Sequence, residues 1–250
     1  ALGTVVAVPD VAATAGRTLV ALGDSYASGV GTRTYYVASG ACKRSPYAYP
    51  VVEARQLSAA LTFVACAGAT TAGVLRTQVA ALSPSTTDVT VTVGGNDAGF
   101  RSVVVACAQP AWSSDCDGAI DRAQAYISTD LAKQLNVLYR AIRARAPAAQ
   151  VIVAGYPYLF NGEDCNAGTW FSPAEEGRLN VTSDQLDGVL ARRAAAHGFE
   201  FVDTRVAFTG HAVCASDEWI NGLSNPVTES YHPNRHGQAG YAALVDPHLG

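Results

Sequence analysis

Two of the short segments that could do chemistry carry a serine and a histidine. The first is the tetrapeptide Gly-Asp-Ser-Tyr at residues 23–26, and the second is Ser-Tyr-His-Pro at residues 230–233. A serine hydroxyl is a weak nucleophile at neutral pH and needs a positioned base, for which histidine has a suitable pKa. Ser25 and His232 therefore form a candidate nucleophile and base.

Two further segments could stabilise the oxyanion that such a nucleophile creates. They are Ala-Gly-Ala at residues 67–69 and Gly-Gly-Asn-Asp at residues 94–97. The oxyanion needs hydrogen-bond donors, and the N–H groups of Ser25 and Gly68 with the side-chain amide of Asn96 are the candidates. Each segment alone is an ordinary turn or helix start, so only their joint placement indicates a site. Asp24 and Asp97 are interpreted as turn-forming residues.

Strands that alternate with helices must position these segments. Short β-branched runs predict strands at residues 18–22, 61–66, 89–93, 150–154 and 200–202. Such alternation is typical of a parallel sheet. Three of the four segments directly follow the first three strands, and ligands of open parallel sheets bind at the carboxyl ends of the strands. We therefore expect the segments to converge on one edge.

The helices expected between and after the strands follow from apolar spacing and capping signals. The longest runs from about residue 120 to 146, a second runs from the Ser-Pro-Ala-Glu capping box at 172–175 to just before Gly198, and a closing helix covers 234–245. Ser45-Pro46 predicts one more helix start. Long loops around 33–41, 160–171 and 210–228 are candidates for substrate contact.

The composition sets the broad class of the protein. With 250 residues, 49% of them hydrophobic and 15% charged, the chain is expected to form a single folded domain over residues 18–250. Residues 1–17 are interpreted as a leader or pro-like extension. A net charge of −4 without a run of Lys or Arg excludes a nucleic-acid partner, and no apolar stretch reaches the ~18 to 20 residues of a membrane-spanning helix.

The six cysteines are even in number and lack metal-type Cys-x-x-Cys spacing. With so few charges, disulfides in a secreted protein are the expected explanation, and a cytosolic protein with inert thiols is the alternative. Six cysteines allow 15 pairings, of which the pair nearest in sequence, Cys107 with Cys116, is the first to expect.

Taken together, Ser25, Gly68, Asn96 and His232 resemble the four blocks of the SGNH, or GDSL, hydrolase family, over residues 22–233. The resemblance implies an α/β fold, a three-layer α/β/α sandwich with a mostly parallel, roughly five-stranded flavodoxin-like sheet. It makes Ser25 the nucleophile and His232 the general base and then acid. It makes Ser25, Gly68 and Asn96 the oxyanion hole, with no metal or other cofactor.

The first block has Tyr26 where the family name has Leu, a change expected to lie outside the chemistry. In this the chain resembles the actinobacterial secreted lipases and phospholipases of the family. That subgroup implies three disulfides, namely Cys42–Cys66, Cys107–Cys116 and Cys165–Cys214.

The group that orients His232 is left open. The family usually has Asp three residues before the histidine, where this chain has Glu229. That carboxylate could hold the imidazole tautomer, although its side chain is one methylene longer. Alternatively, the main-chain carbonyl of Ser230 could do so, because a His-carbonyl dyad needs only local backbone geometry.

The other histidines have ordinary interpretations. His236 follows His232 at the spacing of a helical metal pair, but Pro233 intervenes and no third ligand joins them, so no metal site is expected. His197 precedes Gly198, where a cation would suit a helix C-terminus. His211 and His248 are expected in a loop and in the tail.

The leading hypothesis is a secreted, extracellular, monomeric serine esterase. It would hydrolyse carboxylic esters of lipids through an acyl-enzyme, as a metal-independent phospholipase A/B or lipase at a membrane or micelle surface. The alternatives are a carbohydrate acetylesterase of the same family and a non-catalytic binding module on the same scaffold, against which the intact Ser, Gly, Asn and His positions weigh. Loop aromatic residues could stack on sugars or line an acyl groove, namely Trp112, Trp170, Phe171 and Trp219.

Overall fold

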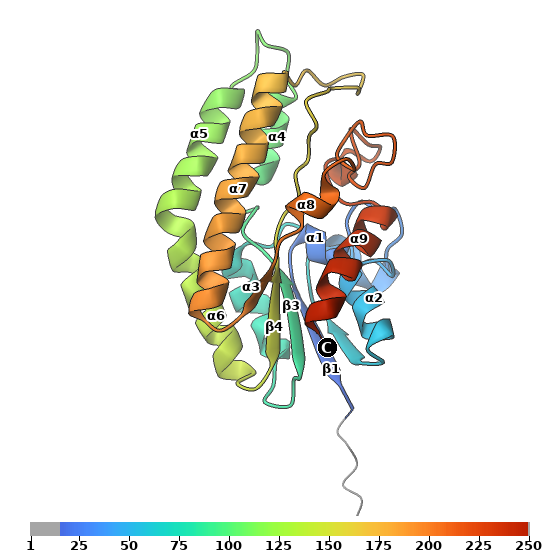
Figure 1. The fold of residues 1–250 in the computed structure, drawn as a ribbon, viewed down its shortest axis with the longest axis vertical. Coiled ribbons are helices and arrows are strands. Elements are labelled where there is room, and N and C mark those ends of the chain that lie inside the picture. Colours follow the sequence, from blue (N-terminus) through green and yellow to red (C-terminus); the bar gives the residue numbers. More distant parts are fainter. Residues whose placement is uncertain (1–15, 250) are drawn as a thin grey trace, which may run out of the picture.

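The computed structural model describes residues 16–249, and its centre is a five-stranded parallel sheet (Figure 1). The strand order is β2-β1-β3-β4-β5, and every neighbouring pair is parallel. The predicted fold class is confirmed. The bounds of the strands are β1 Thr18–Gly23, β2 Ala60–Phe63, β3 Asp88–Thr92, β4 Gln150–Ala154 and β5 Glu200–Val202.

Helices cover both faces of this sheet (Figure 1). One layer contains α3 (Thr71–Thr77), α4 (Phe100–Cys107), α5 (Cys116–Tyr126), α6 (Ala132–Arg145) and α7 (Pro173–Ala196). The other contains α1 (Ser25–Ser28), α2 (Tyr49–Gln56), α8 (Arg205–Phe208) and α9 (Arg235–Val245). Short 3-10 segments lie at Val37–Cys42, Val79–Ala81, Val227–Glu229 and Asp246–His248.

The apolar stripe predicted between residues 120 and 146 forms much of the core. Its six members are at most 1% exposed, namely Ile120, Ile127, Leu131, Leu135, Leu138 and Ile142. The helical stretch begins earlier than predicted, at Cys116, and a π-helical turn at Ile127–Leu131 joins α5 to α6. A π turn contains one more residue than an α-helical turn and so rotates the helix that follows it. The apolar residues of α5 and α6 can therefore form one continuous side that packs on the sheet.

Two sequence expectations about element bounds are wrong. Ser45 does not start a helix, because its hydroxyl accepts a hydrogen bond from the Tyr47 amide at 3.0 Å and closes a turn. Helix α2 begins only at Tyr49. Strand β2 ends at Phe63 rather than at residue 66, because the amides of Val64 and Ala65 both bond to one carbonyl, that of Ala21, at 3.0 Å.

The expected leader lies almost entirely outside the described residues. Its last residue, Arg17, is described, and its Nε lies 2.6 Å from Oδ2 of Asp88 at the start of β3. The side chain of Asp88 is 2% exposed, so this ion pair is largely shielded from water on its acidic side.

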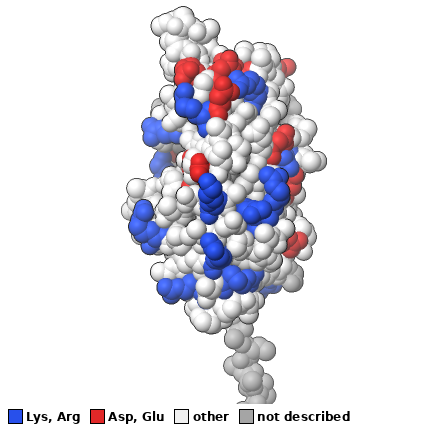
Figure 2. Space-filling view, turned by 90° about the vertical axis from the view of Figure 1, so that its left-hand side faces the viewer, with Lys and Arg blue, Asp and Glu red and all other residues white. Residues whose placement is uncertain are grey.

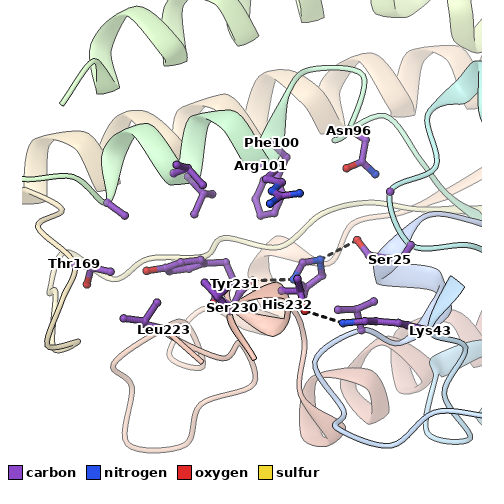
Figure 3. A pocket seen from close by; sticks show the side chains of 18 of the residues that line it. Ser25, Lys43, Asn96, Phe100, Arg101, Thr169, Leu223, Ser230, Tyr231 and His232 are labelled. Atoms are coloured by element: carbon purple, nitrogen blue, oxygen red, sulfur yellow. Dashed lines mark hydrogen bonds between the residues drawn. The ribbon is translucent and has the colours of Figure 1, made fainter. Parts of the chain in front are cut away.

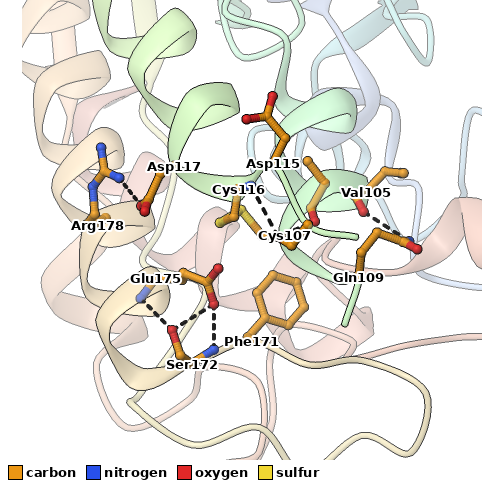
Figure 4. Close-up of a disulfide and its surroundings, with 12 residues drawn as sticks. Val105, Cys107, Gln109, Asp115, Cys116, Asp117, Phe171, Ser172, Glu175 and Arg178 are labelled. Atoms are coloured by element: carbon orange, nitrogen blue, oxygen red, sulfur yellow. Dashed lines mark hydrogen bonds and ion pairs between the residues drawn. A yellow bond between two sulfur atoms is a disulfide. The ribbon is translucent and has the colours of Figure 1, made fainter. Parts of the chain in front are cut away.

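The structure contains three disulfides with the pairing that the resemblance implies, Cys42–Cys66, Cys107–Cys116 and Cys165–Cys214. The second joins the end of α4 to the start of α5 (Figure 4). Beside it, Ser172 and Glu175 form the predicted capping box at the start of α7, and Arg178 pairs with Asp117. The three disulfides therefore cross-link the loops and helix ends in which their cysteines lie.

Candidate active site

Ser25 stands at the point where β1 passes into α1. Gly23, the last residue of β1, has a φ of 128°, and a Cβ there would lie 2.3 Å from the carbonyl oxygen of Thr92. Only glycine allows this approach of the two strands. The buried side chain of Gln78 accepts a hydrogen bond from the Gly23 amide at 2.7 Å and donates one to its carbonyl at 2.9 Å. Gln78 therefore fixes both the amide and the carbonyl of Gly23, two residues before Ser25.

Asp24 connects the serine segment with the Asn96 segment. Its carboxylate accepts hydrogen bonds from the Tyr26 amide at 2.9 Å and from the Tyr156 hydroxyl at 2.5 Å. The same hydroxyl accepts a bond from the Gly95 amide at 3.1 Å. Burial raises the pKa of Asp24 to about 7, and the two bonds to its carboxylate oppose that shift. Asp24 caps its own turn, as its interpretation from the sequence proposed, and also reaches the neighbouring segment.

Asp97 joins the second and third segments. Its carboxylate accepts hydrogen bonds from the Thr71 amide at 2.9 Å and from the Thr71 hydroxyl at 2.6 Å, at the start of α3. Asn96 donates from its side-chain amide to the carbonyl of Ala69 at 3.0 Å. The loops that follow β2 and β3 are therefore tied together around Gly68.

His232 lies between Ser25 and Ser230 (Figure 3). Its Nε2 is 2.8 Å from the Ser25 hydroxyl, and its Nδ1 is 2.8 Å from the Ser230 carbonyl oxygen. A carbonyl can only accept, so Nδ1 carries the proton and Nε2 is free to accept one from the serine. Burial lowers the pKa of His232 to about 4, the bond to Ser230 opposes the shift, and the charge of Lys43 adds to it. The ring is neutral at neutral pH.

A short pairing of two chain segments fixes the backbone of His232. The Tyr231 amide donates to the Asn221 carbonyl at 2.8 Å, and the Asn221 amide donates to the His232 carbonyl at 3.0 Å. Tyr231 has a φ of 57°, a left-handed conformation that turns the chain between Ser230 and His232. The Tyr26 hydroxyl also donates to the Tyr231 carbonyl, at 2.8 Å. The Tyr26 ring also lies beside the imidazole, with centroids 5.3 Å apart, so Tyr26 helps to position the histidine.

Glu229 is not among the hydrogen-bond partners of the imidazole, which are Ser230 and Ser25. It is only 3% exposed, and no hydrogen bond joins its carboxylate to His232 in residues 16–249. Burial and, after it, the nearby Glu229 carboxylate raise the pKa of Tyr35 to about 12. Of the two groups that the sequence left open, the Ser230 carbonyl is the one in contact with the ring.

The three expected oxyanion donors lie around one cavity with Ser25 and His232. Gly68 has a φ of 78°, which presents its amide toward the open side of the turn. Within the described part of the chain, neither this amide nor that of Ser25 has a protein acceptor. The side-chain amide of Asn96 has two N–H groups, and only one is used by Ala69. Donors are thus available where a tetrahedral oxyanion would form.

The cavity has a volume of about 380 Å³ and is mostly apolar. It runs from Ser25 between α4 and the segment at residues 223–231 (Figure 3). The expected contact loops contribute Ala41, Thr169, Leu223, Val227 and Thr228. Sequence reasoning missed Lys43, the α4 residues Phe100, Arg101, Val104 and Val105, and Ala108 directly after α4. No local motif distinguishes them, and only the disposition of α4 brings them to the site.

The loop aromatic residues considered as sugar or acyl contacts do not line this cavity. Trp112 is 88% exposed and Trp170 is 54% exposed. Phe171 packs against Phe160, and Trp219 stacks on His211 with ring centroids 4.0 Å apart.

The remaining histidines lie apart from the site. His236 pairs with Asp217 at 3.6 Å, and His248 contacts Glu200. His197 directly follows α7; burial lowers its pKa and the charges of neighbouring arginines lower it further, which opposes the cation expected at this helix end. Figure 2 shows the face formed by α5, α6 and α7, on which Lys and Arg side chains gather toward the lower end.

One group of three potential metal ligands occurs within residues 16–249. It consists of Cys165, Cys214 and Glu218, and the two cysteines are joined to each other in a disulfide. The same residues include no helix long and apolar enough to cross a membrane.

Comparison with known proteins places the chain in a family. The sequence profile of the GDSL-like lipase/acylhydrolase family matches residues 21–239. A lipase from Streptomyces rimosus is 42% identical over 230 residues, which are 91% of this chain and 85% of the relative.

Two crystal structures are similar over nearly the whole chain. An extracellular lipase from Streptomyces rimosus has a TM-score of 0.87 at 41% identity and covers 92% of this chain and 99% of its own. A phospholipase A1 from Streptomyces albidoflavus NA297 has a TM-score of 0.88 at 39% identity, with coverage of 93% and 99%. The chain belongs to the GDSL family of lipases and acylhydrolases, a family of carboxylic ester hydrolases, and the predicted resemblance is confirmed.

Proposed function

We propose that this protein is a secreted serine esterase that cleaves lipid esters, as a phospholipase A/B or lipase, through an acyl-enzyme on Ser25. The observation that carries the proposal is the line of contacts from Ser25 through His232 to the Ser230 carbonyl, two hydrogen bonds of 2.8 Å each, at the end of an apolar cavity. The mechanism needs no metal, because the histidine supplies the base and protein amides supply the oxyanion donors.

Acylation begins with the attack of Ser25 Oγ on the ester carbonyl carbon. The Oγ proton moves to Nε2 of His232, and the carbonyl oxygen becomes an oxyanion. The amides of Ser25 and Gly68 and the free N–H of Asn96 stabilise this charge. The Ser230 carbonyl accepts from Nδ1, which fixes the tautomer and stabilises the imidazolium.

Acylation ends when His232 gives its proton to the leaving alkoxide, the carbon–oxygen bond of the ester breaks, and the acyl group stays on Ser25. Deacylation repeats these steps with water. The neutral ring then takes a proton from water, whose oxygen attacks the acyl carbon. Collapse of the second tetrahedral intermediate returns the proton to Ser25 Oγ and releases the carboxylic acid.

The shape and lining of the cavity favour an acyl chain over an acetyl group. Its walls along α4 and the 223–231 segment are apolar and extend well beyond Ser25, whereas the loop aromatic residues suited to sugars lie outside it. Burial of each methylene contributes about 0.8 kcal/mol, so such a groove selects long chains. The names of the relatives, lipase and phospholipase A1, support the same substrate class.

Secretion of a monomer is part of the same proposal. Secretion is supported by the three disulfides, which are typical of proteins from oxidising compartments, and by the relative described as extracellular.

Hydrolysis of p-nitrophenyl butyrate by the wild type and by Ser25→Ala tests the chemistry. We expect kcat to fall by about 10⁶, the scale seen when a serine nucleophile is removed. Equal activity of the two proteins, or two equally inert proteins, would overturn the proposal. Addition of EDTA should leave the wild-type rate unchanged.

The substrate class is tested with phosphatidylcholine, triacylglycerol and acetylated xylan. Preference for the xylan would replace the lipid assignment by the carbohydrate acetylesterase alternative.

A further inference from the structure

The two lysines of the chain have different surroundings. Lys133 is exposed on α6 and forms an ion pair with Asp130 at 3.2 Å. Lys43 is half-buried and lines the cavity that contains Ser25 and His232. Its ammonium donates to the Thr228 hydroxyl at 2.7 Å, and within residues 16–249 it has no carboxylate partner. Lys43 is therefore a partly desolvated cation without a counter-ion.

The cavity around Lys43 carries only positive charge. Its other charged lining residue is Arg101, in the first turn of α4, and no Asp or Glu of the described chain lines the cavity. The charge of Lys43 also reaches His232, whose pKa it helps to lower. Removing a charge from water is costly unless a partner compensates it. An anionic group of a ligand would supply that partner.

The backbone around Lys43 is held in place by several constraints. Lys43 adopts a left-handed φ of 49°, a strained conformation for a residue with a side chain. It follows Cys42, which is bonded to Cys66 and whose carbonyl accepts from the Ala67 amide at 3.1 Å. The position of the cation is thus coupled to the turn that presents Gly68.

The direction of the reaction indicates which part of a substrate meets Lys43. His232 protonates the leaving alkoxide, so the leaving group must lie beside its Nε2. In Figure 3, Lys43 lies on one side of His232, and the apolar end of the cavity at Leu223 and Thr169 lies on the other. An acyl chain in the apolar end would direct the glycerol part of a lipid toward Lys43.

We propose that Lys43 binds the phosphodiester of a glycerophospholipid and so makes the enzyme prefer phospholipids to neutral lipids of the same chains. The inference rests on the proposed function and specifies its substrate. A hydrogen-bonded charge pair of this kind changes affinity by about tenfold to a hundredfold.

The test uses two substrates with the same acyl chains, dihexanoyl phosphatidylglycerol and dihexanoylglycerol, both below their aggregation concentrations. For Lys43→Met, the ratio of kcat/KM for the phospholipid to kcat/KM for the neutral lipid should fall by about tenfold to a hundredfold, mainly through KM. Lys43→Arg should restore most of the ratio, because it keeps the charge. Lys133→Met is the matched control and should leave the ratio at its wild-type value.

Two further measurements separate recognition from structure. Glycerophosphate should inhibit the wild type competitively and Lys43→Met at least tenfold more weakly. The acid limb of the pH profile should move to higher pH in Lys43→Met, because the charge that lowers the pKa of His232 is gone.

An equal loss on both substrates would overturn the inference, since it would mean that Lys43 only holds Thr228 in place. Wild-type selectivity retained by Lys43→Met would overturn it as well. A wild type that is inert toward both esters, with an unreactive Ser25, would instead refute the proposed function and the inference with it.

Discussion

The floor and the walls of the cavity are built differently. The floor consists of Ser25, Gly68 and Asn96 at the ends of parallel strands, where buried polar groups such as Gln78 and Asp24 hold each turn through short hydrogen bonds. The walls consist of α4 and of long loops, with exposed apolar side chains such as Val105 and Val227. Chemistry that tolerates little displacement lies on the rigid part, and contacts that choose the substrate lie on the variable part.

The largest effect should come from a change in the floor. Asn96→Ala removes one proposed oxyanion donor, so we expect kcat for p-nitrophenyl butyrate to fall by about 10² to 10³ with little change in KM. Asn136→Ala is the matched control, because Asn136 lies on α6, bonds His197 and does not line the cavity. A loss below about threefold in Asn96→Ala would assign the oxyanion hole to main-chain groups alone.

A change in the walls should alter selectivity instead of rate. Ala108 follows α4, about 12 Å along the helix from Phe100 at the rise of 1.5 Å per residue, and lines the cavity. Ala108→Trp should shorten the groove and lower the ratio of laurate to butyrate hydrolysis by about tenfold or more, the effect of two lost methylene contacts. Gln109→Trp, outside the lining, is the control. An unchanged ratio would show that acyl chains do not follow α4.

The smallest effect is expected at Glu229, the residue next to Ser230 that the imidazole does not contact. Glu229→Ala should reduce kcat by less than tenfold, because the Ser230 carbonyl orients the ring. The acid limb of kcat/KM should stay near pH 4 in both proteins, since burial lowers the pKa of His232 to about 4 and only the neutral ring accepts the serine proton. A loss of about 10⁴ would instead establish a carboxylate triad. Glu229→Gln controls for the lost volume.

The sequence predicted the floor better than the walls, for a physical reason. Strands β4 and β5 have the predicted bounds, and Ser25, Gly68 and Asn96 follow strands whose carboxyl ends must meet at one edge. Lys43 and Phe100 carry no local pattern, because their role depends on where a loop and a helix pack. Ser45 misled the helix prediction because its hydroxyl serves a turn as readily as a helix cap.

Tyr26 is a single residue whose role also depends on long-range packing that the sequence does not predict. Its position beside the serine can be read from the sequence, but its bond to the Tyr231 carbonyl joins residues 205 positions apart. The side chain therefore supports the histidine, a role that only the folded chain reveals.

Ser25 and His232, the proposed nucleophile and base, lie 207 residues apart in the chain. During synthesis, a growing chain that already contains Ser25 and the first four strands has no imidazole to activate it. The hydrolytic pair forms only after the final segment has folded back beside the first strand, against Tyr26 and Asn221. An esterase whose activity depends on this pair would therefore stay inactive for as long as it remains an unfinished polypeptide.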